Sequence, residues 1–239
     1  MITAKNFESV LQAIGFVKKQ DFYEKIYSQY SCVLRVDFRQ KKIIYPESIK
    51  GGNRNGTFDR AENFVVFECV NRLLEKGYRP EHIVLEKEWH LGHEAKSGRA
   101  DICVNAPNES MLFIIECKTA GQEFDKAYKD TLNDGGQLFS YWQQEQATKW
   151  LVLYTADYKD NKLSYKAPTL NCSDDPNIVE LARKDTRILL FSKAHTASEK
   201  YNVWKETYDS QIYENLIFSE DSRAYDIGIR PLYKRDLQD

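Results

Sequence analysis

Three charged residues lie in an otherwise apolar stretch of the sequence, residues 98–118. Asp101, Glu116 and Lys118 are accompanied there by isoleucine, valine, leucine and phenylalanine, in GRADICVNAPNESMLFIIECK. Burying an ionised carboxylate costs several kcal/mol unless another group pairs with it. Two carboxylates and an ammonium in such a stretch therefore indicate either an ion pair that closes a sheet edge or a site that performs chemistry.

The spacing predicts how these three side chains meet. Two apolar runs, RADICV and MLFIIECK, flank NAPNES, which has the composition of a turn. In an antiparallel hairpin centred near Asn108, Asp101 and Glu116 are opposed, with Cβ atoms ~4.5–5.5 Å apart. Lys118 falls on the same face because side chains alternate along a strand. The three charged groups are therefore expected to converge at one end of the hairpin.

Such a cluster suits a divalent cation. Two carboxylates at such a short distance repel each other. This repulsion raises the pKa of one of them unless a cation lies between the two. Mg²⁺ takes oxygen ligands, commonly uses one or two carboxylates and retains water. Lys118 is placed to position an attacking water or to stabilise negative charge in the transition state. The residue types favour metal-assisted hydrolysis of a phosphodiester, and the plain ion pair stays open as the alternative.

The surrounding residues resemble a known nuclease motif. GRADI before Asp101 and IIECK around Glu116 have the form of the PD-(D/E)xK motif, with Ala100 in place of the usual proline. AENFVVFECVNRLLEKGY upstream and GGQLFSYWQQ downstream extend the likeness over residues 58–155. Together these segments are similar to the N-terminal nuclease domain of type I restriction subunits and of fused restriction-modification enzymes that carry an N6-adenine methylase.

This resemblance implies further site residues. Glu62 matches a glutamate on the preceding helix of that family, which binds metal directly or through water. Gln137 and Tyr141 match a Q-x-x-x-Y element, and their spacing puts both on one helical face, within reach of a phosphate or of the catalytic lysine. The implied metal ligands are Asp101, Glu116 and Glu62. The implied cofactor is Mg²⁺, with Mn²⁺ as a substitute.

The resemblance also implies a fold, an activity and partners. The implied fold is α/β and restriction-endonuclease-like, with a central mixed β-sheet flanked by helices. The implied activity is endonucleolytic cleavage of double-stranded DNA in a restriction-modification system, alongside methyltransferase, translocase and specificity domains or subunits. Two alternatives stay open: a module that binds DNA or assembles without cleaving, and a RecB-like exonuclease or junction resolvase.

Apolar periodicity and turn residues predict the remaining elements. Helices are expected at residues 5–15, at 60–78 with Gly77 as the C-cap, and at 123–146 with a break at Gly135 and Gly136. A hairpin is expected at 27–45, and strands at 82–91, 99–104, 111–118, 150–156, 158–168 and 186–191. We therefore expect an N-terminal extension at 1–57, the nuclease core at 58–197 and a segment at 198–239 that leads to a further domain.

Composition narrows the class of protein. A formal net charge of −2 argues against a protein that wraps DNA through bulk positive charge, although a local basic groove is compatible with it. The candidates for such a groove are Arg54, Arg60, Lys96, Arg99, Lys126 and Lys129, although solvated surface positions are the default interpretation for lysines and arginines. The five cysteines form no CxxC pair and are expected to be reduced, with Cys69 and Cys103 in the core. No apolar run approaches the ~20 residues of a membrane span, so we expect a cytoplasmic protein.

Weaker motifs favour ordinary structural roles. His90 and His93 have no cysteine or carboxylate set to complete a zinc site, which favours an exposed turn. GGNRNG is not followed by G-K-[ST], so it reads as a flexible linker rather than a phosphate-binding loop. Glu86 and Glu88 flank Lys87 on a predicted strand, and the sequence does not distinguish which of them supports the site.

Overall fold

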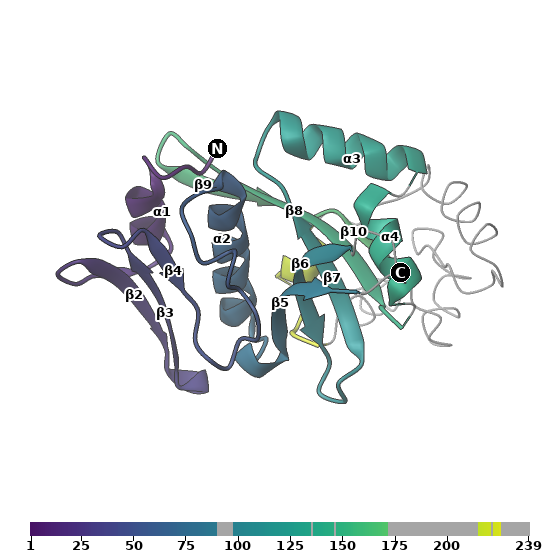
Figure 1. The fold of residues 1–239 in the computed structure, drawn as a ribbon, viewed down its shortest axis with the longest axis horizontal. Coiled ribbons are helices and arrows are strands. Elements are labelled where there is room, and N and C mark those ends of the chain that lie inside the picture. The colour runs from purple at the N-terminus through teal and green to yellow at the C-terminus, as the bar shows by residue number, and fades with distance from the viewer. Residues whose placement is uncertain (90–97, 135, 146, 172–214, 221, 226–239) are drawn as a thin grey trace, which may run out of the picture.

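The computed structural model describes residues 1–89, 98–134, 136–145, 147–171, 215–220 and 222–225. In chain order the elements are α1 (Phe7–Ala13), β1 (Val17–Lys18), β2 (Phe22–Tyr27), the 3₁₀ helix η1 (Ser28–Tyr30), β3 (Cys32–Asp37), β4 (Lys42–Ile44), α2 (Ala61–Lys76), η2 (Pro80–His82), β5 (Ile83–Glu88), β6 (Arg99–Asn105), β7 (Met111–Cys117), α3 (Gln122–Asp134), α4 (Gly136–Gln144), β8 (Trp150–Lys159), β9 (Lys162–Lys166), β10 (Thr169–Asn171) and η3 (Leu216–Phe218). This confirms the α/β class. Figure 1 shows α2 between the two sheets.

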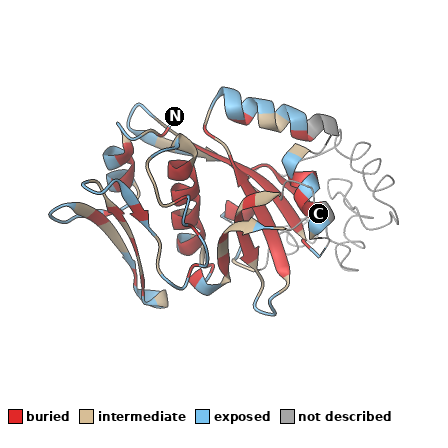
Figure 2. Cartoon of the chain, viewed as in Figure 1, coloured by how far each residue is buried: buried red, intermediate tan, exposed pale blue. Residues whose placement is uncertain are grey.

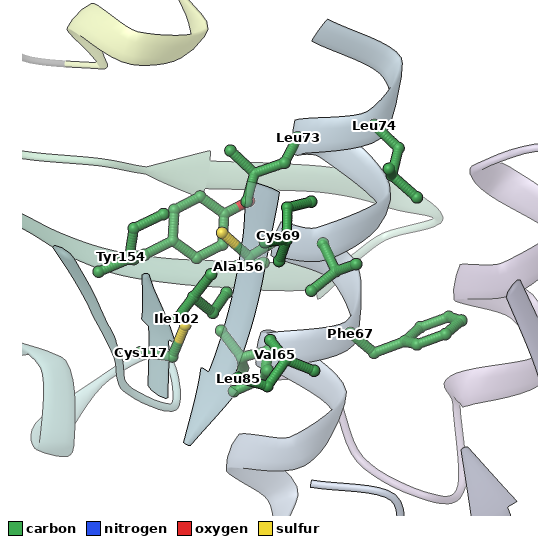
Figure 3. Packing of buried hydrophobic residues seen from close by; sticks show 14 of the residues in the cluster. Val65, Phe67, Cys69, Leu73, Leu74, Leu85, Ile102, Cys117, Tyr154 and Ala156 are labelled. Carbon is green, nitrogen blue, oxygen red and sulfur yellow. The ribbon is translucent and has the colours of Figure 1, made fainter. Parts of the chain in front are cut away.

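Helix α2 is the central element of the core. Its apolar stripe, predicted from the sequence, is buried along the whole helix, and the chain leaves it through Gly77 at φ 113°. That left-handed conformation suits glycine, so the predicted C-cap is confirmed. Figure 3 shows Cys69 facing Tyr154 and Cys117 of the second sheet, whereas Phe67 points the other way. The helix therefore packs against a sheet on each side.

The N-terminal sheet has the order β1-β2-β3-β4, and all its strands are antiparallel. The predicted hairpin at 27–45 is present as β3 and β4, but β1 and β2 precede it and were not predicted. Buried side chains of α1 and of this sheet belong to the same apolar cluster as α2. Phe7 of α1, for example, packs against Phe64 and Phe67 with ring centroids 4.5 and 5.7 Å apart. The domain boundary at residue 57 stays a prediction.

The second sheet is mixed and carries the candidate site. Its order is β10-β8-β7-β6-β5, with β9 paired to β8 off this path. The pairing of β7 with β8 is parallel and its other pairings are antiparallel. Side chains on one face of β6, β7 and β8 pack against α2, and those on the other face pack against α3 and α4. The burial map in Figure 2 shows the strands at the centre of this sheet almost wholly buried.

The helix predicted at 123–146 is divided as expected. Helix α3 ends at Asp134, and α4 begins at Gly136, which has φ 51°. Both helices lie in the connection between β7 and β8. These neighbouring strands are parallel, so the chain has to cross over from the end of one to the start of the other. The break turns α4 so that Leu138, Tyr141 and Trp142 pack under the sheet.

The sequence also predicts reduced cysteines and the absence of a membrane span. Cys69 and Cys103 are buried free thiols, as expected, and so are Cys32 and Cys117. Within the described ranges, no helix has the length and apolar character needed to cross a membrane. Several predicted features lie outside the described residues, namely the strand at 186–191, most of the segment 198–239, Cys172, His90, His93 and Lys96.

Candidate active site

The β6–β7 hairpin has the register that the sequence predicts. Ile102 pairs with Ile115, and the next two pairs follow in step until a shift next to the turn, at Asn105. Continuing the same register one step places Asp101 opposite Glu116. The Oδ2 atom of Asp101 accepts a hydrogen bond from the backbone N–H of Cys117, at 2.8 Å. This bond fixes the aspartate at the end of the hairpin.

Lys118 connects two of the carboxylates. Its ammonium is ion-paired with Oε1 of Glu116 and lies 3.4 Å from Oε1 of Glu62. The Lys118 backbone is held as well, because its N–H donates to the carbonyl of Tyr154 on β8, at 2.9 Å. Glu62 reaches the cluster from the first turn of α2. Glu62 and Lys118, which are 56 positions apart in the sequence, are therefore in contact in the fold.

Tyr141 contacts the cluster from α4. Its hydroxyl lies 3.1 Å from Oε2 of Glu116 and 2.7 Å from the backbone carbonyl of Arg99. Gln137, one turn earlier, donates from Nε2 to the Tyr141 hydroxyl at 3.4 Å. The two side chains thus share a helical face, as their spacing predicts. The tyrosine contacts the glutamate, whereas the sequence had favoured a phosphate or the lysine as its partner.

Two residues that position Tyr141 were missed by the sequence analysis. Trp89 stacks on the tyrosine ring, with centroids 5.6 Å apart and an interplanar angle of 25°. A Cβ atom at Gly98 would lie 3.2 Å from Cε1 of the same ring, so the glycine leaves room for it. Residues between Trp89 and Gly98 gave no pattern that connects either of them to α4. The signal available in the sequence was only an aromatic and a glycine on either side of a polar turn.

Burial controls the protonation of the carboxylates. It raises the pKa of Asp101 well above the ordinary range, and Glu116 and Glu62 raise it further, against the N–H of Cys117 and the charge of Lys118. Burial also raises the pKa of Glu116, which is 4% exposed, while Lys118 opposes that rise. Burial alone lowers the pKa of Lys118, but the adjoining carboxylates, Glu116 first, more than offset this, so its pKa is raised. The lysine is therefore charged at neutral pH.

The three carboxylates of the cluster provide oxygen atoms, the type of ligand that Mg²⁺ takes. Among the described residues, no group of three or more histidines, cysteines, aspartates and glutamates is arranged so that it could hold a metal ion by itself. Mg²⁺ does not need one, since one or two carboxylates plus waters and substrate oxygens suffice. Asp101, Glu116 and Glu62 bring three carboxylates towards the single ammonium of Lys118, so negative charge is in excess when all three are ionised. A divalent cation would compensate that excess.

A hollow of about 840 Å³ lies beside the cluster. It is lined by the start of α2, the end of β7 and the near sides of α3 and α4, with Glu62, Glu116 and Lys118 in its wall. Of the basic residues expected to line a DNA groove, Arg60 and Lys126 line this hollow. Arg54 and Arg99 line a smaller hollow instead, and the exposed Lys129 lines neither of the two.

The segment GGNRNG is attached to the site, contrary to its interpretation as a flexible linker. Lys50 just before it forms a parallel bridge with Val84 of β5. The side chain of Asn63 in α2 donates to the carbonyls of Arg54 and Thr57, at 3.1 and 3.0 Å. These bonds hold the segment between β5 and the start of α2, and only the tertiary structure reveals them.

Glu86 has an unusual backbone conformation. Its φ is 55° in the middle of β5. Leu85 and Lys87 on either side of it pair with Ile102 and Ala100 of β6, whereas Glu86 and Asp101 do not pair with each other. Left-handed φ values are rare for residues other than glycine and are often found near functional sites. The Glu86 carboxylate accepts a hydrogen bond from the backbone N–H of Arg54, at 3.1 Å. Of the two glutamates beside Lys87, Glu86 is thus the one that ties the segment to the strand.

The fold and the site thus define an α/β protein in which two carboxylates from strands and a lysine lie at one end of a hairpin. A third carboxylate, from a helix, contacts the lysine. No family model matches the chain, and no curated protein matches its sequence. The functional argument therefore depends on the residues and their geometry.

Proposed function

We propose that this chain is a Mg²⁺-dependent DNA endonuclease with a restriction-endonuclease-like fold. The observation that carries the proposal is the meeting of Asp101, Glu116 and Lys118 at one end of the β6–β7 hairpin, beside an open hollow. The central mixed sheet with helices on both faces supports the same fold. A structural ion pair explains Glu116 and Lys118, but not a second, half-buried carboxylate next to them.

Each residue has a role that follows from its contacts. Asp101 and Glu116 would hold the metal, with Glu62 binding it directly or through water. When bound, Mg²⁺ supplies Lewis-acid activation of the phosphodiester and of a water molecule. Lys118 carries its positive charge into the hollow, where it orients the attacking water or stabilises the charge that develops on the phosphate. The Tyr141 hydroxyl, next to Oε2 of Glu116, restricts the rotation of that carboxylate.

The proposed substrate is argued from the same site, and the proposed partners from the motif resemblance. Double-stranded DNA is the substrate, approached through the hollow that Arg60 and Lys126 line. Methyltransferase, translocase and specificity parts of a restriction-modification system are the proposed partners, on the strength of the motif resemblance. In such a system these parts would direct where the cleavage occurs.

Cleavage of supercoiled plasmid in Mg²⁺ or Mn²⁺ tests this proposal. We expect nicking or linearisation by the unmodified chain, and a loss of ~10²–10³-fold or more in Glu116→Gln and in Lys118→Met, the size typical of removing a transition-state contact. Glu109→Gln is the matched control, since Glu109 is an exposed glutamate at the other end of the same hairpin. Circular dichroism checks that every variant is folded.

The outcomes separate the alternatives. Equal cleavage by Glu116→Gln and the unmodified chain would show that the site is wrong or that the activity is a contaminant. Preference for free ends or four-way junctions over closed circles would favour an exonuclease or a resolvase. Binding of DNA without cleavage in either metal, by the chain alone and with a methyltransferase partner, would favour a non-cleaving module.

A further inference from the structure

A second, smaller hollow adjoins the carboxylate cluster. Its volume is about 320 Å³, at the lower end of the ~300–1,000 Å³ of pockets that enclose small ligands. Asp101 and Glu62 line it on the side of the cluster, and Glu62 also lines the larger hollow. The rest of the wall is formed by the GGNRNG segment, by the residues that connect it to α2 and begin that helix, and by Arg99 of β6. The two hollows therefore meet at the proposed metal ligands.

The segment that forms this wall is held in place by backbone hydrogen bonds and close packing. Gly51 has φ 81°, and a Cβ atom there would lie only 2.1 Å from the carbonyl oxygen of Leu85, so the backbone of the segment lies directly against β5. Lys50 exchanges two backbone hydrogen bonds with β5, donating to Ile83 at 3.2 Å and accepting from Leu85 at 2.8 Å. With the Asn63 and Glu86 bonds described above, these contacts fix where the side chains of the segment lie.

Asn55 supplies a donor that has no acceptor. The residue is 6% exposed and lines the smaller hollow. Its side-chain nitrogen is buried, and no hydrogen-bond partner for it exists within the described part of the chain. An unpaired buried donor destabilises the folded state, because it has lost its hydrogen bonds to water without gaining another. Such a cost is unusual in a native structure, and a ligand in the hollow removes it when the amide turns to present this donor to the ligand.

The charges of the hollow indicate which ligand this is. Three arginines, Arg54, Arg60 and Arg99, line it, and guanidinium groups match phosphate oxygens in geometry. The Arg99 guanidinium also lies 4.0 Å from a carboxylate oxygen of Glu88. Asp59 stands among the lining residues too, together with the carboxylates of the cluster, so the hollow has no large net positive charge. A ligand with both anionic oxygens and polar groups that can donate fits this mixture better than a bare anion. One nucleotide has this chemistry and the right size.

We propose that the smaller hollow binds the nucleotide next to the cleaved phosphodiester. Its phosphate lies against Arg54 and Arg99, and the Asn55 amide donates to one of its oxygens. The proposal rests on the nuclease function proposed above and names the part of the DNA that this side of the site holds. The segment between β4 and α2 is then a substrate-binding element, which Glu86 and Asn63 position through their hydrogen bonds.

Salt dependence of DNA binding tests this subsite without relying on cleavage. The probe is a short fluorescein-labelled duplex, titrated by anisotropy in Ca²⁺ at several NaCl concentrations. The logarithm of the association constant falls linearly with the logarithm of the salt concentration, and losing one phosphate contact reduces the magnitude of this slope by about one. We expect that decrease in Arg54→Gln and again in Arg99→Gln, each with about tenfold weaker binding at low salt.

Two further variants keep the test specific. Asn55→Asp keeps the shape of the side chain but replaces the donor with a negative acceptor, so it should weaken binding at least as much as Arg54→Gln. Arg39→Gln is the control, because Arg39 is an arginine that is 81% exposed on the β3–β4 turn, and its slope should equal that of the unmodified chain. Circular dichroism confirms the fold of each.

The outcomes distinguish this proposal from the one it rests on. If the unmodified chain binds and cleaves DNA while the Arg54, Asn55 and Arg99 variants bind with unchanged slope and affinity, the subsite is overturned and the nuclease stands. An equal drop in slope for Arg39→Gln also overturns the subsite, because the effect is then one of general charge. If the unmodified chain neither binds nor cleaves DNA, the proposed function fails and the subsite fails with it.

Discussion

At the scale of residues, Asp101 and Glu116 show what it costs to hold carboxylates ready for a cation. Burial and mutual repulsion raise the pKa of Asp101, so the folded chain binds this proton more tightly than the unfolded chain does. Between the ordinary carboxyl pKa, ~4, and the raised value, the folded state carries more protons than the unfolded state. The free energy of unfolding therefore falls as the pH rises through that window. The metal-free protein is destabilised at the pH where a nuclease would act.

Asp101→Asn should reverse this destabilisation. The asparagine keeps an acceptor for the N–H of Cys117 but has no proton to lose. We expect the variant to unfold at a higher temperature than the unmodified chain at pH 8 in EDTA, by ~2–4 °C for each kcal/mol recovered. The difference should shrink as the pH falls towards ~4, where the native aspartate is protonated in the folded state. Thermal unfolding followed by circular dichroism at several pH values measures it, and a gain independent of pH would contradict the explanation.

At the scale of elements, the GGNRNG segment determines whether the smaller hollow exists. Gly51→Ala should detach this segment from β5, because the new Cβ would overlap the carbonyl of Leu85 and the residue would keep a left-handed φ. We expect a loss of ~1–3 kcal/mol in the free energy of unfolding. Gly121→Ala is the matched control, since Gly121 also has a positive φ, 95°, but no atom lies within 4 Å of its added Cβ. Urea unfolding compares the two, and equal losses would mean that the steric contact is unimportant.

Elements governed by local patterns were predictable from the sequence. The stripe and Gly77 located α2, the turn residues around Asn108 set the register of Asp101 against Glu116, and Gly136 marked the start of α4. These features depend on residues close together in the chain. The left-handed φ of Glu86 and the attachment of the GGNRNG segment depend on hydrogen bonds to distant elements, which no local pattern encodes.

At the scale of the whole molecule, α2 makes the two sheets parts of one apolar core. All four tryptophans lie after residue 88, so their fluorescence reports on the part of the chain that carries the site. Phe7→Ala, which removes a fully buried ring of α1, should therefore lower the midpoint of the tryptophan transition, with a loss of ~3–5 kcal/mol. The circular dichroism transition should move by the same amount.

Ser9→Ala on the exposed side of α1 is the control for that experiment and should leave both midpoints within experimental error. A tryptophan transition that does not respond to Phe7→Ala would show that the N-terminal sheet and the sheet of the site unfold independently. It would then support a division of the chain at residue 57.

The parallel pairing of β7 and β8 also sets an order in time. The β6–β7 hairpin closes through a short turn, so it can form early in folding and bring Asp101 and Glu116 together. Strand β8 joins only after the crossover through α3 and α4 has closed, a non-local step that is slower. Tyr141 arrives with that crossover. We therefore expect the newly folding chain to hold its two carboxylates together before the tyrosine restrains Glu116, and the site to reach its final geometry late in folding.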